Sequence, residues 1–189
     1  ALKLSTAVTD EIHELSMPHA TFEVHVRSGA TEKFSDFTEY GIDDVEMVFS
    51  SHGDGPLLPI AKAASGGELS RLMLGIEVVI AGSDPVGTYV FDEVDAGVGG
   101  KAAIEVGRRL AKLARQTQVI VVTHLAQVAA WADHHFVVAK NESGAVTESS
   151  VLSVSDIDRE REIARMLSGQ EKSEIAQQHA KELLAQIRS

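Results

Sequence analysis

Residues Tyr89–Ala103 read YVFDEVDAGVGGKAA, and this stretch decides the fold. An apolar run ends in two adjacent carboxylates, Asp92 and Glu93, and a glycine-rich turn then leads into a segment of helix-forming residues. Glycine-rich turns between a strand and a helix often bind phosphate, whereas paired carboxylates often hold Mg²⁺ and orient water. The stretch therefore predicts a nucleotide site and raises the question of which residues complete it.

Strand-like and helix-like segments alternate along the chain, which indicates an α/β fold with a mainly parallel sheet flanked by helices. The run QVIVVTH (118–124) is continuously apolar and β-branched, as expected of a strand buried on both faces of a parallel sheet. The other expected strands are 21–26, 45–49, 88–91, 135–140 and 145–152. The expected helices run from Leu69 to near Gly82 and over 102–116, 125–133, 156–169 and 173–189.

Composition narrows the class of function. The 189 residues are 44% hydrophobic and contain no cysteine, which excludes disulfides and thiolate chemistry and favours a cytoplasmic protein. No apolar run is long enough to cross a membrane, so no membrane partner is expected. The formal charge of −11 disfavours a broad nucleic-acid surface, which needs clustered Lys and Arg.

The four residues Ser65, Gly66, Gly67 and Glu68 stand at the start of a helical pattern. Ser followed three residues later by Glu is a capping box, which requires no further function. Two glycines after the Ser are not needed for a cap, and they leave the first-turn N–H groups bare. Together with the helix dipole, such groups form an anion site. On local grounds both interpretations remain open.

Polar side chains follow two neighbouring strands where each strand ends. Asp92 and Glu93 follow TYVF, and His124 closes QVIVVTH. Because the carboxyl ends of parallel strands meet at one sheet edge, we expect these three side chains to share that edge. Asp92 suits holding hydrated Mg²⁺, and Glu93 suits orienting or deprotonating a water.

The glycines of 97–102 match two known nucleotide-binding motifs only in part. The pattern G-x-G-x-x-A matches a loose dinucleotide fingerprint, but five residues separate it from the strand and no acidic residue follows at the ribose position. A P-loop would require Gly where Asp95 stands and Ser or Thr where Ala102 stands. The glycines therefore do not form a phosphate loop.

Four motifs in order resemble the C-terminal half of an ABC-type ATPase head. ASGGELSR resembles the signature motif, YVFDE the Walker B strand, VDAGVGG the D-loop and VVTH the switch-histidine strand. The segments FDEVDAGVGGKAA and VTHLAQVAA are similar to sequences of the RecN family, a bacterial DNA-repair branch of the SMC-related ATPases. That resemblance extends over nearly the whole chain, including EIARMLSG near the C-terminus.

The resemblance implies ATP and Mg²⁺ as cofactors and assigns a role to each motif. Asp92 would support Mg²⁺ through water, Glu93 would be the general base, and His124 would contact the γ-phosphate. The D-loop, with Asp95 as its coupling residue, would connect two sites across a dimer. Residues 65–68 would complete, in trans, the site of a partner head. The D-loop residues are Asp95, Ala96 and Gly97.

The resemblance also implies partners. Residues 1–16, with apolar residues at helical spacing, would be the end of a descending coiled-coil helix, and 17–189 the C-terminal lobe of the head. No G-x-x-x-x-G-K-[ST] occurs in the sequence. We therefore expect a fragment that is inactive alone and works with its own N-terminal Walker A lobe and a second head. DNA would bind through the full-length protein, on the nucleoid after DNA damage.

Three alternatives remain. Another SMC-like, recombination-mediator or transporter head would share the mechanism, and the words DAGVGG and THLAQVAA argue against these. A non-catalytic interaction domain could retain the same fold, and an ATP-binding measurement separates it from an ATPase. A nicotinamide-dependent oxidoreductase rests only on G-x-G-x-x-A, and NAD binding without an effect of ATP would favour it.

Overall fold

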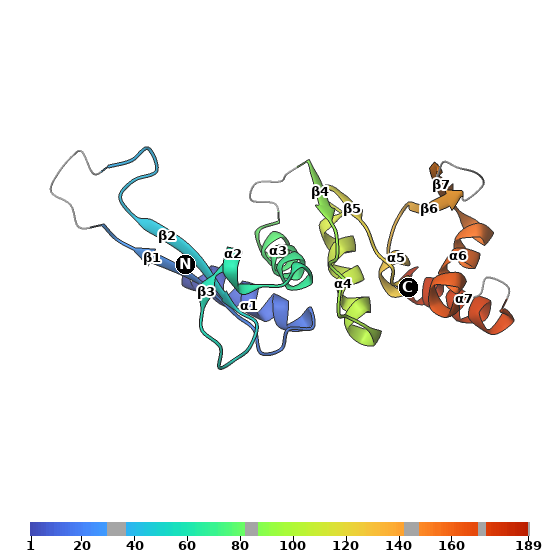
Figure 1. Cartoon of the computed structure of the whole chain (residues 1–189), viewed down its shortest axis with the longest axis horizontal. Helices are drawn as coiled ribbons and strands as arrows, with labels where there is room; N and C mark the ends of the chain where they lie inside the picture. The colour runs from blue at the N-terminus through green and yellow to red at the C-terminus, as the bar shows by residue number, and fades with distance from the viewer. Residues whose placement is uncertain (30–36, 82–86, 142–147, 170–172, 189) are drawn as a thin grey trace.

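The computed structural model describes residues 1–29, 37–81, 87–141, 148–169 and 173–188, and its elements follow one another along an elongated chain (Figure 1). The mixed α/β class is confirmed. The elements are α1 (Leu2–Glu14), β1 (Thr21–Arg27), β2 (Asp44–Ser50), β3 (Leu58–Pro59), α2 (Ile60–Ala63), α3 (Gly66–Ile80), β4 (Thr88–Phe91), α4 (Gly100–Leu113), β5 (Gln118–Val121), α5 (Ala126–Ala129), β6 (His135–Asn141), β7 (Glu148–Val154), α6 (Asp156–Ser168) and α7 (Glu174–Arg188).

The N-terminal part of the fold is an antiparallel sheet, in the order β1-β2-β3, packed with α1. Val8 and Ile12 of α1 are fully buried in one cluster with Phe22 of β1 and Phe49 of β2. Leu72 of α3 joins the same cluster, so this core also anchors the helix whose first turn contains residues 66–68. The apolar residues that recur at helical spacing in 1–16 thus pack into the core.

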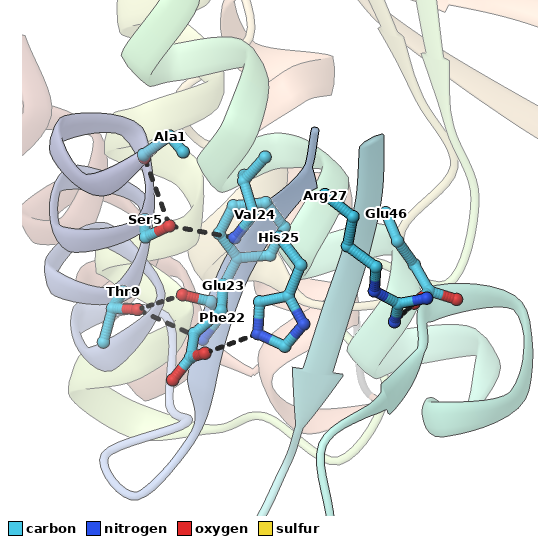
Figure 2. A network of polar contacts seen from close by, with 9 residues as sticks. All are labelled: Ala1, Ser5, Thr9, Phe22, Glu23, Val24, His25, Arg27 and Glu46. Carbon is cyan, nitrogen blue, oxygen red and sulfur yellow. Dashed lines mark hydrogen bonds and ion pairs between the residues drawn. The ribbon is translucent and has the colours of Figure 1, made fainter. Parts of the chain in front are cut away.

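Hydroxyl side chains of α1 pair with the outer edge of β1 (Figure 2). Thr9 Oγ1 accepts from the Phe22 N–H at 3.1 Å and donates to the Phe22 carbonyl at 3.2 Å. One helical turn earlier, Ser5 Oγ accepts from the Val24 N–H at 2.9 Å. An unpaired strand edge is a template for association with another chain, so these hydroxyls both satisfy the backbone and protect the edge.

The edge pairing predicts a stability difference between two threonines of α1. Thr9→Val should lower the free energy of unfolding by about 1–2 kcal/mol, because two backbone groups of Phe22 lose their partner. Thr6→Val is the matched control, since Thr6 is exposed and the helix propensities of Thr and Val are similar. Urea unfolding of the three proteins measures the effect, and equal losses for both variants would contradict it.

The central part of the fold is the parallel pair β4–β5, in the register Phe91 opposite Val121. Phe91 is buried in a core with side chains of α3 and α4, among them Leu74 and Val106. Among the described residues, parallel pairing is confined to these two strands; the other two sheets are antiparallel. The expected parallel centre is therefore present but narrow.

One face of this parallel pair is open. Val90, Ile120 and Val122 are 66%, 47% and 59% exposed. The expectation that 118–124 is buried on both faces is therefore wrong for this chain. Because side chains alternate along a strand, the residues on the other face pack on α3 and α4, whereas no described element covers these three. The apolar sequence of the strand fits a sheet that has a second layer.

A buried arginine joins the first helix to α4. Arg109 of α4 is 6% exposed, and its Nε donates to Glu11 of α1 at 2.6 Å. Its Nη1 also bonds Glu105, one helical turn earlier on α4. A buried cation of this kind requires such partners. The pairing connects α1 to the helix that directly follows the glycine-rich turn.

The C-terminal part contains the hairpin β6–β7 and a third core shared by α5, α6 and α7. The helix expected over 125–133 is shorter, because α5 ends at Ala129 and the chain turns to place Trp131 against Gly107 of α4. A β-carbon at Gly107 would lie 2.2 Å from the Trp131 ring, so this approach requires glycine. Within the described ranges, no helix is long and apolar enough to cross a membrane.

Candidate nucleotide site

The N-terminus of α3 carries a complete capping box. Ser65 Oγ accepts from the Glu68 N–H at 3.4 Å, and Glu68 Oε2 accepts from the Ser65 N–H at 2.9 Å and from the Ser65 hydroxyl at 3.0 Å. The structural interpretation of this motif is therefore correct. It does not exclude anion binding, because Gly66 and Gly67 stand in the first turn, where no intrahelical carbonyl reaches their N–H groups.

The capping box also sets the charge of Glu68. The backbone hydrogen bond from Ser65 lowers the pKa of the Glu68 carboxyl below its ordinary value of 4.5, against a smaller opposite effect of burial. The Ser65 hydroxyl and the positive charges of Arg71 and His52 lower it further. Glu68 is thus held as a carboxylate at the positive end of the helix dipole, where a negative charge is favourable.

The depressed pKa of Glu68 predicts a pH-dependent contribution to stability. A carboxyl whose folded pKa lies below its unfolded value stabilises the fold above that unfolded value, near 4.5, and loses the effect as the pH falls through the folded pKa. The stability difference between the wild type and Glu68→Gln should therefore be largest near about pH 7 and shrink towards about pH 3.

Urea unfolding across that range measures this difference, with Glu14→Gln as the matched exposed control on α1. A Glu68→Gln difference that stays constant with pH, or that follows the control, would contradict the proposed origin of the stabilisation.

The two glycines let the start of α3 approach the loop that follows β4. A β-carbon at Gly67 would lie 2.8 Å from the Ala96 β-carbon and 3.2 Å from the carbonyl oxygens of Ala96 and Glu93. A β-carbon at Gly66 would lie 2.7 Å from Glu93 Oε2. The structure thus brings residues 65–68 and 92–96 together within one chain, a contact that the sequence analysis did not foresee.

Two further side chains of α3 hold the same loop, and neither was predicted as a site residue. Ser70 Oγ donates to the Asp92 carbonyl at 2.8 Å, and Arg71 Nη1 donates to the Ala96 carbonyl at 2.7 Å. Arg71 is 6% exposed, and burial lowers the pKa of its guanidinium, partly offset by the charge of Glu68. The available signal was a charged residue on the buried helix face, at helical spacing from Leu74.

The carboxylates and the histidine share one edge of the parallel pair, as expected. Phe91 lies opposite Val121, and the Val122 N–H donates to the Phe91 carbonyl at 3.0 Å, so both strands end together. Asp92, Glu93 and His124 follow these ends with exposed side chains. Glu93 has a φ of 58°, a left-handed conformation that is uncommon for a side chain of this size.

Asp95 has hydrogen-bond partners within its own chain. The D-loop interpretation has it connecting to a second head, but the side chain is buried, and its Oδ2 accepts from the hydroxyl of Thr123 and the N–H of His124 in its own chain. A buried carboxylate needs donors, and the loop after β5 supplies them. Ala96 is half-buried, whereas Gly97 is exposed with a φ of 71°, a conformation that favours glycine.

The residues present fit a nucleotide with Mg²⁺. Among the described residues no group of three or more potential metal ligands occurs. Mg²⁺ keeps several waters and is bound through one or two carboxylates together with phosphate oxygens. Asp92 and Glu93 supply such carboxylates, and the bare first turn of α3 suits a phosphate.

Gly66 and Gly67 have different neighbours, which predicts that alanine at the two positions will affect stability differently. Gly67→Ala should lower the melting temperature by several degrees, because its methyl group meets backbone atoms of Glu93 and Ala96. Gly66→Ala should leave stability nearly unchanged, since it meets only the flexible end of Glu93, but should displace that carboxylate.

Thermal unfolding and ATP turnover of the longer protein test both effects. Gly66→Ala should lower turnover by about tenfold or more if Glu93 acts on the reacting water. Equal melting temperatures for the two variants, or normal turnover in Gly66→Ala, would contradict these assignments.

Curated relatives share the sequence throughout the chain. No family model matches it. "DNA repair protein RecN" of Streptomyces coelicolor is 52% identical over 199 residues, covering 100% of this chain and 34% of that protein. The RecN of Deinococcus radiodurans is 48% identical over 174 residues, covering 92% and 29%. Over its own length, this chain belongs to the RecN family. It spans about a third of the length of the curated relatives that it matches.

Solved structures relate this RecN-family chain to Smc heads. The Smc head domain with a coiled coil and joint from Pyrococcus yayanosii matches with a TM-score of 0.60 at 21% identity, over 87% of this chain and 29% of that one. An Smc head bound to the C-winged helix domain of ScpA matches with a TM-score of 0.51 at 22% identity, over 80% and 42%. At these identities the likeness shows the fold, which is that of an Smc head.

Proposed function

We propose that this RecN-family chain is the C-terminal part of an ATPase head in a DNA-repair protein. The observation that carries the proposal is that Asp92, Glu93 and His124 follow the ends of two paired parallel strands and so share one edge. The carboxylates suit metal and water, and the bare N-terminus of α3 beside them suits the phosphate of a second nucleotide. Phosphoryl transfer depends on such positioning and charge stabilisation more than on covalent chemistry.

Each residue then has a separate task. Bound ATP with Mg²⁺ supplies the phosphoryl group and the cation that neutralises its charge. Asp92 holds the hydrated Mg²⁺, and Glu93 orients the attacking water and takes its proton. His124, with a side chain that is 74% exposed, donates to the γ-phosphate. These tasks require Glu93 and His124 to face the same nucleotide, and the shared strand edge supports this.

The signature residues act on the nucleotide of a second head. The Ser65 hydroxyl already donates to Glu68, so the free donors of this turn are the N–H groups of Gly66 and Gly67. These N–H groups bind a γ-phosphate offered by the partner and lose that contact once the phosphate departs. ATP therefore closes a homodimer of heads, and hydrolysis opens it.

The open face of β4–β5 supports a second lobe of the same protein. Val90, Ile120 and Val122 form an exposed apolar surface on strands whose composition is that of a fully covered sheet. About two thirds of the length of the RecN relatives lies outside the matched region. We infer that an N-terminal lobe carrying the Walker A loop covers this face and completes the phosphate site.

The remaining parts of the chain serve the architecture. Residues 1–16 form the end of a coiled-coil helix that docks on β1, and 17–189 form the C-terminal lobe. The formal charge of −11 favours a main DNA contact that lies elsewhere in the longer protein or that forms on assembly. DNA repair, and work on the bacterial nucleoid, are functions of that whole assembly.

Glu93→Gln in the longer protein tests the assignment of the base. ATP binding should persist, because the amide keeps the size of the side chain, while turnover falls by about a hundredfold or more. The variant should accumulate as an ATP-bound dimer. Nucleotide affinity, steady-state turnover and sedimentation measure the three properties.

Glu14→Gln is the matched control, an exposed glutamate on α1 whose loss should change none of these properties. Normal turnover in Glu93→Gln would remove Glu93 from the role of base. A wild-type protein that neither binds nor hydrolyses ATP would instead favour a non-catalytic interaction domain of the same fold.

A further inference from the structure

Asp95 has a buried carboxylate, although it lies close in sequence to the exposed carboxylates of the candidate nucleotide site. It is 2% exposed, and among the described residues it is the one acidic side chain that the fold buries. Its neighbours Asp92 and Glu93 are exposed. Burial of a charge is costly unless donors surround it, so its partners indicate what this carboxylate does.

Among the described residues, the partners of the carboxylate belong to the loop that carries His124. Oδ2 accepts from the Thr123 hydroxyl and, at 3.2 Å, from the His124 N–H. The Nδ1 atom of the His124 ring lies 3.3 Å from the same oxygen. Thr123 Oγ1 in turn accepts from the Leu125 N–H at 3.1 Å. One carboxylate oxygen thus holds the backbone of this loop and lies beside one side of the imidazole.

The loop that presents Asp95 is itself anchored. Ser70 and Arg71 of α3 hold the carbonyls of Asp92 and Ala96 on either side of it. Within the loop, the Val98 N–H donates to the Asp95 carbonyl at 3.1 Å. Asp95 is therefore a fixed point against which the more exposed histidine can be held.

We propose that Asp95 and Thr123 are positioning residues that hold His124 for phosphate contact within their own chain. This rests on the proposed ATPase function, and it replaces the expectation that Asp95 reaches across to a second head. Because Nδ1 faces the carboxylate, Nε2 is the ring nitrogen left to meet a ligand. The exposed ring is thereby oriented before the nucleotide arrives, which lowers the cost of ordering it.

Three substitutions in the longer protein test the effect on turnover. Thr123→Val keeps the shape but removes the hydroxyl, and should lower kcat by about tenfold while the Kd for ATP changes by less than about threefold. Thr123→Ser keeps the hydroxyl and should restore kcat to within about threefold of the wild type. Thr117→Val is the matched control, since its hydroxyl bonds Gly87 at the other end of β5.

Thr123→Val turnover equal to that of the wild type or the control would overturn the proposal. So would Thr123→Ser turnover as low as that of Thr123→Val, because the hydroxyl would then not be the relevant group.

Hydrogen exchange of the same proteins supplies a readout that does not depend on hydrolysis. Thr123→Val should speed amide exchange in peptides that cover 122–126 and leave those of β4 unchanged. Unchanged exchange at 122–126, or faster exchange throughout both strands, would overturn the positioning role in favour of none or of a general structural one. A wild type without ATPase activity would refute the proposed function, while the local exchange effect would still decide whether Thr123 fixes the loop.

Discussion

The contact between Gly67 and Ala96 is the constraint on which the site depends. With no side chain at Gly67, the first turn of α3 reaches the backbone of the loop after β4. A β-carbon at this position would lie 2.8 Å from the Ala96 β-carbon, so a larger residue would force the two apart. That approach places a helix N-terminus, with its positive dipole end, next to the carboxylates that follow the strand.

Two buried charges make this arrangement rigid. Arg71 donates to the carbonyl of Ala96, and Asp95, the preceding residue, accepts from Thr123 and His124. Both side chains are almost inaccessible to solvent, so each depends strongly on its hydrogen bonds. Hydrogen bonds therefore join α3 to the loop after β4, and join that loop to the loop after β5. These hydrogen bonds form a route by which a displacement of α3 would reach the loop that carries His124.

The parallel pair that carries the site is covered on one face only by the described residues. Its inner face packs on α3 and α4, while Val90, Ile120 and Val122 remain in contact with solvent. An antiparallel sheet can keep one polar face in water, but a parallel pair with apolar residues on both faces calls for cover on each side. The site edge and the open face belong to the same two strands. A lobe that covered this face would therefore also lie next to the site.

The sequence by itself determined the α/β class, the strand at 88–91, a strand expected over 118–124 that ends at Val121 in the structure, and the shared edge of Asp92, Glu93 and His124. These follow from local periodicity and from the geometry of parallel strands. It also determined the capping box, which needs only four consecutive residues. Only the tertiary structure decided that Gly67 meets Ala96, that Arg71 holds the loop, and that Asp95 turns inward. These contacts join residues that are 25 or more positions apart, and the choice between a buried and an exposed carboxylate depends on donors that only folding brings within reach.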